Sequence, residues 1–136
     1  MNQRALVEAA WAMLPKAYVP YSHFHVGAAL LTADGEVFTG CNVENASYGA
    51  AICAERTALV KAVSEGKRDF QAIAVVGGRD GVVTDFAPPC GICRQVLAEF
   101  CGPDFLILLA KSPEEIRVFR LEELLPEAFG REKLSE

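Results

Sequence analysis

The sequence predicts an α/β protein with a mixed five-stranded sheet that carries helices on both faces. Two continuously apolar segments, 72–76 and 105–110, are typical of strands buried within a sheet. Two further segments, 52–65 and 91–100, have the helical spacing of apolar residues and alternate with those strands. The dipeptide Asp34-Gly35 marks a tight hairpin turn between two other strand-like segments.

The N-terminal part of the chain predicts one helix followed by a β-hairpin. Apolar residues of segment 6–14 recur at helical spacing after a possible Asn2 cap, and Pro15 ends the segment. The mostly apolar segment 24–32 predicts the first strand, and segment 37–43 predicts the strand that returns beside it.

The middle of the chain alternates loops with regular elements. In order, we expect a loop over 42–49, a helix over 52–65, a buried strand over 72–76, a loop over 77–89 and a helix over 91–100. The first of these loops is rich in Asn, Ser and Gly, and the first of these helices stops at Gly66.

The last two strands are expected to be antiparallel. Segments 105–110 and 116–120 predict the strands, and only residues 111–115 separate them. Such a connection can close a hairpin, but it is too short for the crossover that parallel strands need. Segment 121–125 predicts a short closing helix.

Length and composition predict one globular domain over residues 1–136. The formal charge of −5 argues against a nucleic-acid partner, which normally needs a basic patch. No segment approaches the roughly 18 apolar residues of a membrane span, and the N-terminal residues lack the apolar core of a signal peptide. Five cysteines, an odd number that includes one Cys-x-x-Cys pair, favour metal or redox use in a reducing compartment. We therefore expect a cytoplasmic protein.

Two short motifs carry the strongest chemical signal: Cys53-Ala54-Glu55, and Pro89-Cys90-Gly91-Ile92-Cys93. Thiolates suit zinc, and a catalytic zinc site has three protein ligands and leaves a fourth position for water. No His stands near either motif to complete a structural site. The motifs predict that Cys53, Cys90 and Cys93 bind zinc and that Glu55 moves protons beside it.

Both motifs fall where a loop passes into a predicted helix. Cys90 and Cys93 are three residues apart and share one face of a first helical turn, while Cys53 opens the other helix. The positive ends of both helices would favour thiolates. Cys53 and Glu55 would diverge on a regular helix, so they can converge only if Cys53 lies at the cap or first turn.

Three thiolates leave zinc with a formal charge of −1, which weakens its effect on bound water. Arg56 directly follows Glu55, and Arg94 directly follows Cys93. Either guanidinium could offset the sulfur charge by hydrogen bonding to the ligands. Either could instead be an ordinary charge on a helix surface.

Other uses of the cysteines remain open. A Cys-x-x-Cys pair also occurs in redox proteins and in structural zinc knuckles. Cys41 could supply the fourth ligand of a structural site, although its place in a strand favours a small buried residue. Cys101 is expected in the core or partly exposed.

Four motifs occur in a specific order: YSHFHVGAAL at 21–30, GCNVENASYG at 40–49, CAERTA at 53–58 and PCGICRQV at 89–96. With these motifs the chain resembles the zinc-dependent nucleoside and nucleobase deaminases, and more narrowly the small homotetrameric cytidine deaminases. The match covers nearly the whole chain. Deaminases of tRNA or single-stranded DNA usually have His in place of Cys53. The resemblance implies a three-layer cytidine deaminase-like fold, one Zn²⁺ per subunit and a homotetramer with shared active sites.

The resemblance also implies substrate-binding roles. Asn42 and Glu44 would bind the ribose hydroxyls; segment 42–45 could instead be a polar turn, although the charge of Glu44 has no obvious role in a turn. Phe24 would pack against the pyrimidine ring, or it could be a core residue of the first strand.

The remaining implied roles concern Ala54, which would contact the substrate, and three residues at a neighbouring subunit's pocket: Ala46, Tyr48 and Phe129. Pro88 stands where the family commonly has Ser or Thr. This change removes a donor and a hydroxyl near the site without abolishing zinc binding.

The leading hypothesis is hydrolytic deamination of cytidine and 2′-deoxycytidine in pyrimidine salvage, with release of ammonia. One alternative is a deaminase of a modified aminonucleoside such as blasticidin S, against which the Asn42–Glu44 block argues. Another is a zinc-stabilised binding module without catalysis, for which Glu55→Gln would leave function intact. A nucleic-acid editor is disfavoured by the acidic charge and by the lack of an aromatic-plus-basic stripe.

Overall fold

The computed structural model describes residues 1–134 and confirms the α/β class. Within this range the strands are β1 (Phe24–Thr32), β2 (Val37–Cys41), β3 (Phe70–Arg79), β4 (Leu106–Ser112) and β5 (Glu115–Arg120). The α-helices are α1 (Gln3–Trp11), α2 (Ala54–Ser64), α3 (Gly91–Phe100) and α4 (Leu121–Leu124). Short 3₁₀ helices are η1 (Leu14–Lys16), η2 (Tyr48–Ala50) and η3 (Arg131–Lys133).

The strands form one mixed sheet in the order β2-β1-β3-β4-β5. β1 pairs antiparallel with β2 and β3, β3 pairs parallel with β4, and β4 pairs antiparallel with β5. The predicted antiparallel pairing of the last two strands is therefore confirmed. The parallel pair β3–β4 is joined by the connection that contains α3, which is long enough for a crossover.

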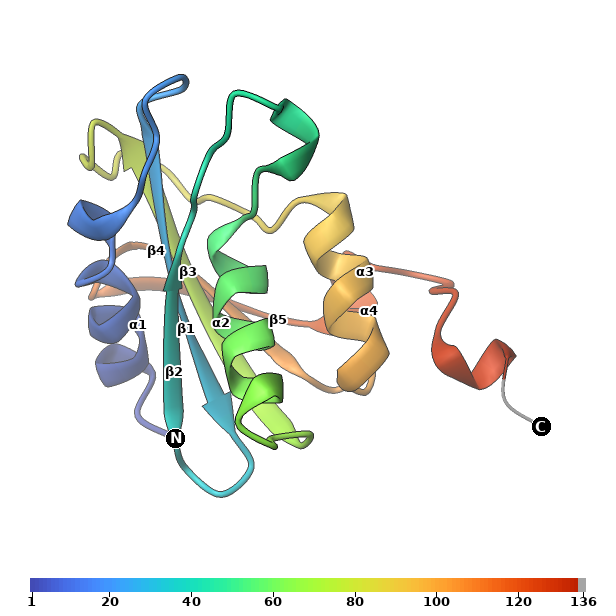
Figure 1. The fold of residues 1–136 in the computed structure, drawn as a ribbon. Helices are drawn as coiled ribbons and strands as arrows, with labels where there is room; N and C mark the ends of the chain where they lie inside the picture. Colours follow the sequence, from blue (N-terminus) through green and yellow to red (C-terminus); the bar gives the residue numbers. More distant parts are fainter. Residues whose placement is uncertain (135–136) are drawn as a thin grey trace.

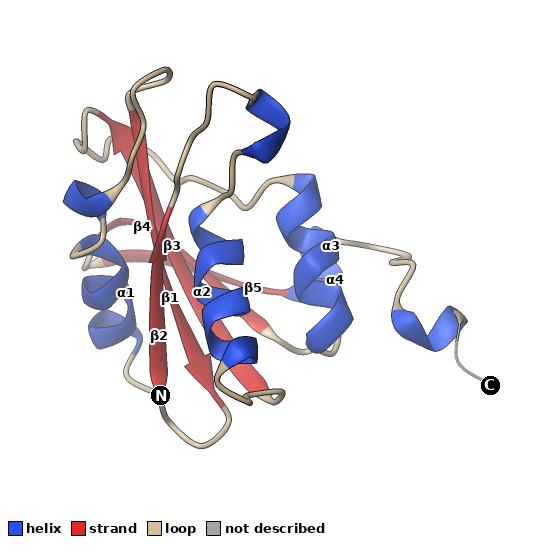
Figure 2. Ribbon diagram, in the orientation of Figure 1, coloured by secondary structure: helices blue, strands red, loops and turns tan. Residues whose placement is uncertain are grey.

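Helices cover both faces of the sheet, as predicted, and give the molecule three layers (Figures 1 and 2). α1 packs over one face with Ala29 and Ala74, whereas α2 and α3 pack over the other with Ala28 and Val75. Neighbouring residues of β1 and β3 thus enter opposite cores, because side chains alternate along a strand.

β3 is longer than the predicted strand 72–76 because its whole length pairs with β1. The extension includes Gly77 and Gly78, residues of low strand propensity. A Cβ on Gly77 would lie 3.0 Å from both Ala87 and Phe24. These glycines therefore allow the loop between β3 and α3 to lie directly on the sheet.

The predicted helix boundaries shift where caps intervene. The predicted helix 52–65 begins at Ala54 because Cys53 is its N-cap residue, and it ends before Gly66, which has φ +91. α1 ends at Trp11, earlier than predicted, and Pro15 lies inside η1. Among residues 1–134, no helix combines the length and the hydropathy that crossing a membrane requires.

Candidate metal centre and substrate cavity

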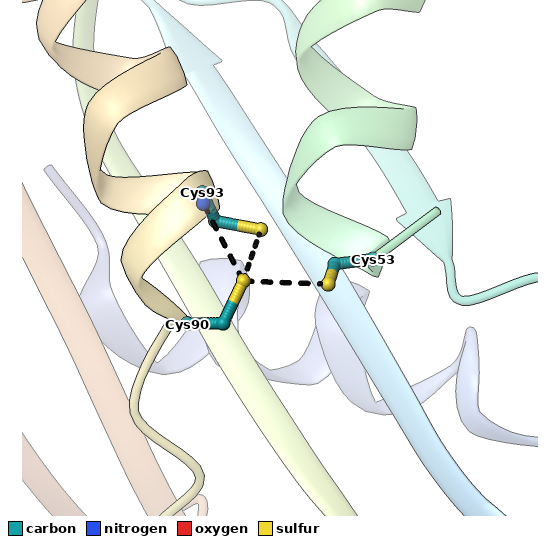
Figure 3. A group of neighbouring side chains, drawn as sticks. All are labelled: Cys53, Cys90 and Cys93. Carbon is teal, nitrogen blue, oxygen red and sulfur yellow. Dashed lines mark hydrogen bonds between the residues drawn. The ribbon is translucent and has the colours of Figure 1, made fainter. Parts of the chain in front are cut away.

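The three predicted zinc ligands lie together at the N-terminal ends of α2 and α3 (Figure 3). Cys53 is the N-cap residue of α2, Cys90 is that of α3, and Cys93 lies in the first turn of α3. The Cys90 Sγ is 3.6 Å from the Cys53 Sγ and 3.3 Å from the Cys93 Sγ. Two motifs far apart in the sequence therefore form one cluster of thiols.

The chemistry of this cluster fits a zinc ion. Its three sulfurs lie within 4.8 Å of one another, and the amide groups of two helix ends favour negative charge there. In the described part of the chain no other His, Cys, Asp or Glu joins the cluster. Three protein ligands would thus leave a coordination position free. Cys41 stands apart, since its thiol donates to the Lys16 carbonyl at 3.4 Å.

Arg56 lies beside the sulfurs, as one of its two proposed roles requires. Its Nη2 is 3.7 Å from the Cys53 Sγ, and its Nε is buried without a hydrogen-bond partner among residues 1–134. A hydrogen bond with the Cys93 thiol, together with the Arg56 guanidinium, lowers the pKa of Cys53 to about 5. The same interaction with Cys53, together with burial, raises the pKa of Cys93. The cluster therefore carries thiolate character before any metal arrives.

Glu55 lies in the first turn of α2 and is only 4 % exposed. Glu55 was expected to approach Cys53 only if Cys53 lies at the cap or first turn of the helix. Cys53 is the cap residue of α2, and the Cys53 and Glu55 side chains line one cavity. Burial raises the pKa of Glu55 to about 7, and the charge on Cys53 acts in the same direction. A carboxyl group with this pKa can both accept and donate a proton near neutral pH.

A cavity of about 440 Å³ opens beside the thiols. Residues predicted for metal, proton transfer or substrate line it: Phe24, Asn42, Glu44, Tyr48, Cys53, Glu55, Arg56 and Cys90. Phe24 is 39 % exposed at the start of β1, so the alternative of a core residue is wrong. Residues predicted from separate sequence motifs therefore line one cavity.

The polar side chains of the cavity are held by the main chain. The Asn42 Oδ1 accepts from the Val26 amide at 2.9 Å, and its Nδ2 donates to the Phe24 carbonyl at 2.8 Å. The Glu44 Oε1 accepts from the amides of Tyr21 and Ser22 at 3.0 and 3.1 Å. Hydrogen bonds from Ser22 and Tyr21 hold the pKa of Glu44 below its ordinary value. Glu44 therefore remains a carboxylate at the cavity wall.

Three predicted substrate residues lie outside this cavity lining. Ala54 is fully buried at the start of α2, and Ala46 is exposed on the loop before η2. Phe129 follows α4 and is 53 % exposed, with its carbonyl bound to the Gln95 side chain at 2.7 Å. Cys101 is partly buried, within the range expected for it.

Two features of the site were missed by sequence reasoning. Ile92 lines the cavity and is 63 % exposed, and the signal for it was an apolar residue between two ligands at a helix start. Arg94 does not bind the sulfurs and is not a free surface charge. It donates instead to the main-chain carbonyls of Pro89 and Leu124.

Comparison with known proteins agrees with this geometry. Residues 1–109 match the family model of the cytidine and deoxycytidylate deaminase zinc-binding region. A cytidine deaminase from Halalkalibacterium halodurans is 50% identical over 136 residues, which is 100% of both chains. The 1.6 Å crystal structure of cytidine deaminase from Burkholderia pseudomallei has a TM-score of 0.87 and 52% identity, covering 95% of this chain and 100% of that chain. A blasticidin-S deaminase from Bacillus cereus is 32% identical over 130 residues, or 93% of this chain and 91% of that protein.

Proposed function

Because the chain belongs to the cytidine and deoxycytidylate deaminase zinc-binding family, we propose that it hydrolyses cytidine and 2′-deoxycytidine to the corresponding uridines and ammonia. One observation carries the proposal: Glu55 and two thiols of the cluster, Cys53 and Cys90, share a single cavity with Asn42 and Glu44. This reaction would serve pyrimidine salvage in the cytoplasm.

Cys53, Cys90 and Cys93 would hold one Zn²⁺ per subunit. When bound, the metal supplies Lewis-acid activation of the water that the hydrolysis consumes. The chain contributes sulfurs that are already close together, and the end of α2 and Arg56 favour the thiolate form of Cys53.

Glu55 is the proton carrier of the proposed reaction. Its carboxylate accepts a proton from the attacking water and gives it to N3 of the cytosine ring as oxygen adds at C4. The second proton of the water then reaches the exocyclic amine through Glu55, and ammonia leaves. Burial suits this role, since it raises the pKa of Glu55 to about 7.

The cavity walls are proposed to hold the nucleoside. Asn42 and Glu44 offer amide and carboxylate groups to the ribose hydroxyls, and Phe24 offers its ring to the base. Ala54, the first residue of α2, is also proposed to contact the substrate. A free nucleoside fits this lining better than a polymer, because the chain carries net charge −5.

We further propose a single catalytic domain, 1–136, that assembles as a homotetramer with shared active sites. Ala46, Tyr48 and Phe129 would complete the pocket of a neighbouring subunit. Their exposure supports this role, since the Tyr48 and Phe129 side chains are 77 % and 53 % accessible.

The test combines turnover with zinc content. Purified protein should deplete cytidine, measured by loss of its absorbance band, and release ammonia in equal amount. Glu55→Gln should lower kcat by a factor of about 100 to 10,000 while the protein retains one zinc per chain. A zinc-loaded, folded wild type that turns over no pyrimidine nucleoside contradicts the proposal, and full activity in Glu55→Gln contradicts the role of Glu55.

The relationship to a blasticidin-S deaminase calls for a direct comparison of substrates. We expect a higher kcat/KM for cytidine than for blasticidin S, because Asn42 and Glu44 line the cavity and are proposed to bind ribose hydroxyls. A higher kcat/KM for blasticidin S than for cytidine would identify the antibiotic as the preferred substrate.

A further inference from the structure

Arg94 joins two parts of the molecule through a pair of hydrogen bonds. Its Nε donates to the Pro89 carbonyl at 2.8 Å, and its Nη1 donates to the Leu124 carbonyl at 2.7 Å. The guanidinium is partly buried, and both acceptors are main-chain oxygens. Its planar group of donors suits two acceptors in fixed directions.

The first of these bonds acts on the ligand Cys90. Pro89 is fully buried, and its carbonyl belongs to the peptide group that leads into Cys90. A buried carbonyl requires a partner, and a charged donor gives a stronger bond than a neutral one. Cys90 is the exposed ligand and lies at the cap of α3, outside the regular helix. The bond therefore fixes the backbone beside the one α3 ligand that lies at the cap and not inside the regular helix.

The second bond acts on the C-terminal end of α4. Leu124 is the last residue of α4, and the final carbonyls of a helix have no partner within it. Beyond this point residues 125–134 leave the sheet and carry η3 to the far side of α3 (Figure 1). Gln95, the next residue after Arg94, holds this segment separately by donating to the Phe129 carbonyl at 2.7 Å.

We propose that Arg94 is a positioning residue that keeps Cys90 within the ligand set and ties it to α4. The inference rests on the zinc ligation that belongs to the proposed function. Lysine cannot replace Arg94 fully, because one ammonium group does not present two donors in the fixed directions of the Pro89 and Leu124 carbonyls.

The experiment measures the rate at which zinc passes from the loaded protein to an excess of a chromophoric chelator. Arg94→Gln should release zinc roughly 10 to 100 times faster than wild type, and Arg94→Lys should fall between them. Gln95→Ala is the matched control, because within residues 1–134 it removes only the side-chain bond to Phe129. Gln95→Ala should release zinc at the wild-type rate, while limited proteolysis after Leu125 should become faster in both Gln95→Ala and Arg94→Gln.

Thermal unfolding of the zinc-loaded variants establishes that each is folded at the assay temperature. Equal zinc release from wild type, Arg94→Gln and Gln95→Ala overturns the proposal. If Arg94→Gln does not fold, a wild-type release rate in Arg94→Lys overturns it instead. No nucleoside is present in this assay, so its result does not depend on the proposed substrate. If Arg94→Gln releases zinc faster but the wild-type protein does not deaminate cytidine, the positioning role is supported and only the proposed substrate is rejected.

Discussion

At the scale of single residues, the Asn42 side-chain amide both hydrogen-bonds the main chain of β1 and lines the cavity. It binds the Val26 amide and the Phe24 carbonyl, and these bonds hold the first residues of β1 beside β2. An amide group has two acceptor and two donor positions, so one of each remains for a ligand. A substitution at this position should therefore affect stability as well as substrate binding.

Asn42→Ala should lower the free energy of unfolding by about 1–3 kcal/mol and raise the KM for cytidine. The loss of stability follows because two main-chain groups of β1 lose their partner. Urea unfolding and initial-rate kinetics measure the two effects. Asn45→Ala is the control, since the Asn45 Oδ1 accepts from the Ser47 amide within the same loop. Equal stability of Asn42→Ala and wild type would show that the two hydrogen bonds from the Asn42 side chain to β1 do not stabilise the fold.

At the scale of elements, the close contact between α2 and β2 determines where Cys53 can lie. Gly40 of β2 faces the first turns of α2, and a Cβ there would stand 2.5 Å from the Ala54 carbonyl oxygen and 2.6 Å from the Ala58 amide nitrogen. Main-chain atoms of a helix cannot yield locally, so a side chain at Gly40 must move the whole helix end.

Gly40→Ala should destabilise the protein by about 1–3 kcal/mol and lower its zinc content, because α2 must move away from β2 with Cys53 at its cap. Urea unfolding and metal analysis of the purified variant provide the test. Gly102→Ala, whose Cβ would meet no atom of residues 1–134 within 4 Å, should change stability by less than about 0.5 kcal/mol. If both variants behave alike, the contact at Gly40 does not position the helix.

The sequence predicts the elements well where periodicity and caps are local, as in β1 and α3, whose bounds agree with the structure. The extension of β3 through Gly77 was not predictable, because it depends on pairing with the whole of β1. The ligand set is visible in the sequence because its spacing is local to two motifs. The bond from Arg94 to Leu124 is not, since only the tertiary fold brings these residues together.

At the scale of the whole molecule, the free energy of unfolding depends on pH in the alkaline range because of Cys101. Burial raises the pKa of its thiol from 9.0 to about 12. Between these values the unfolded chain loses the proton while the folded chain keeps it. The unfolded state then binds fewer protons, so the free energy of unfolding falls as the pH rises from about 9 to 12.

Cys101→Ala should reduce this alkaline loss, which amounts to at most about 1.4 kcal/mol per pH unit for one thiol. The measurement is the slope of unfolding free energy against pH, from urea titrations between about pH 8 and 11. The slope is compared rather than the absolute stability, because the smaller side chain also alters packing. A wild-type slope in Cys101→Ala would exclude the linkage.

The short distances within the thiol cluster also govern how the protein must be handled. Without a metal, the exposed Cys90 sulfur has two neighbouring sulfurs, at 3.3 and 3.6 Å, with which an oxidant such as peroxide could form a disulfide. The low pKa of Cys53 increases this hazard, because the thiolate is the reactive form. Zinc would occupy the same sulfur electron pairs and protect them. Metal-free protein therefore requires reductant throughout purification. If the protein is inactive after chelation in air, disulfide formation contributes to the loss of activity in addition to the removal of zinc.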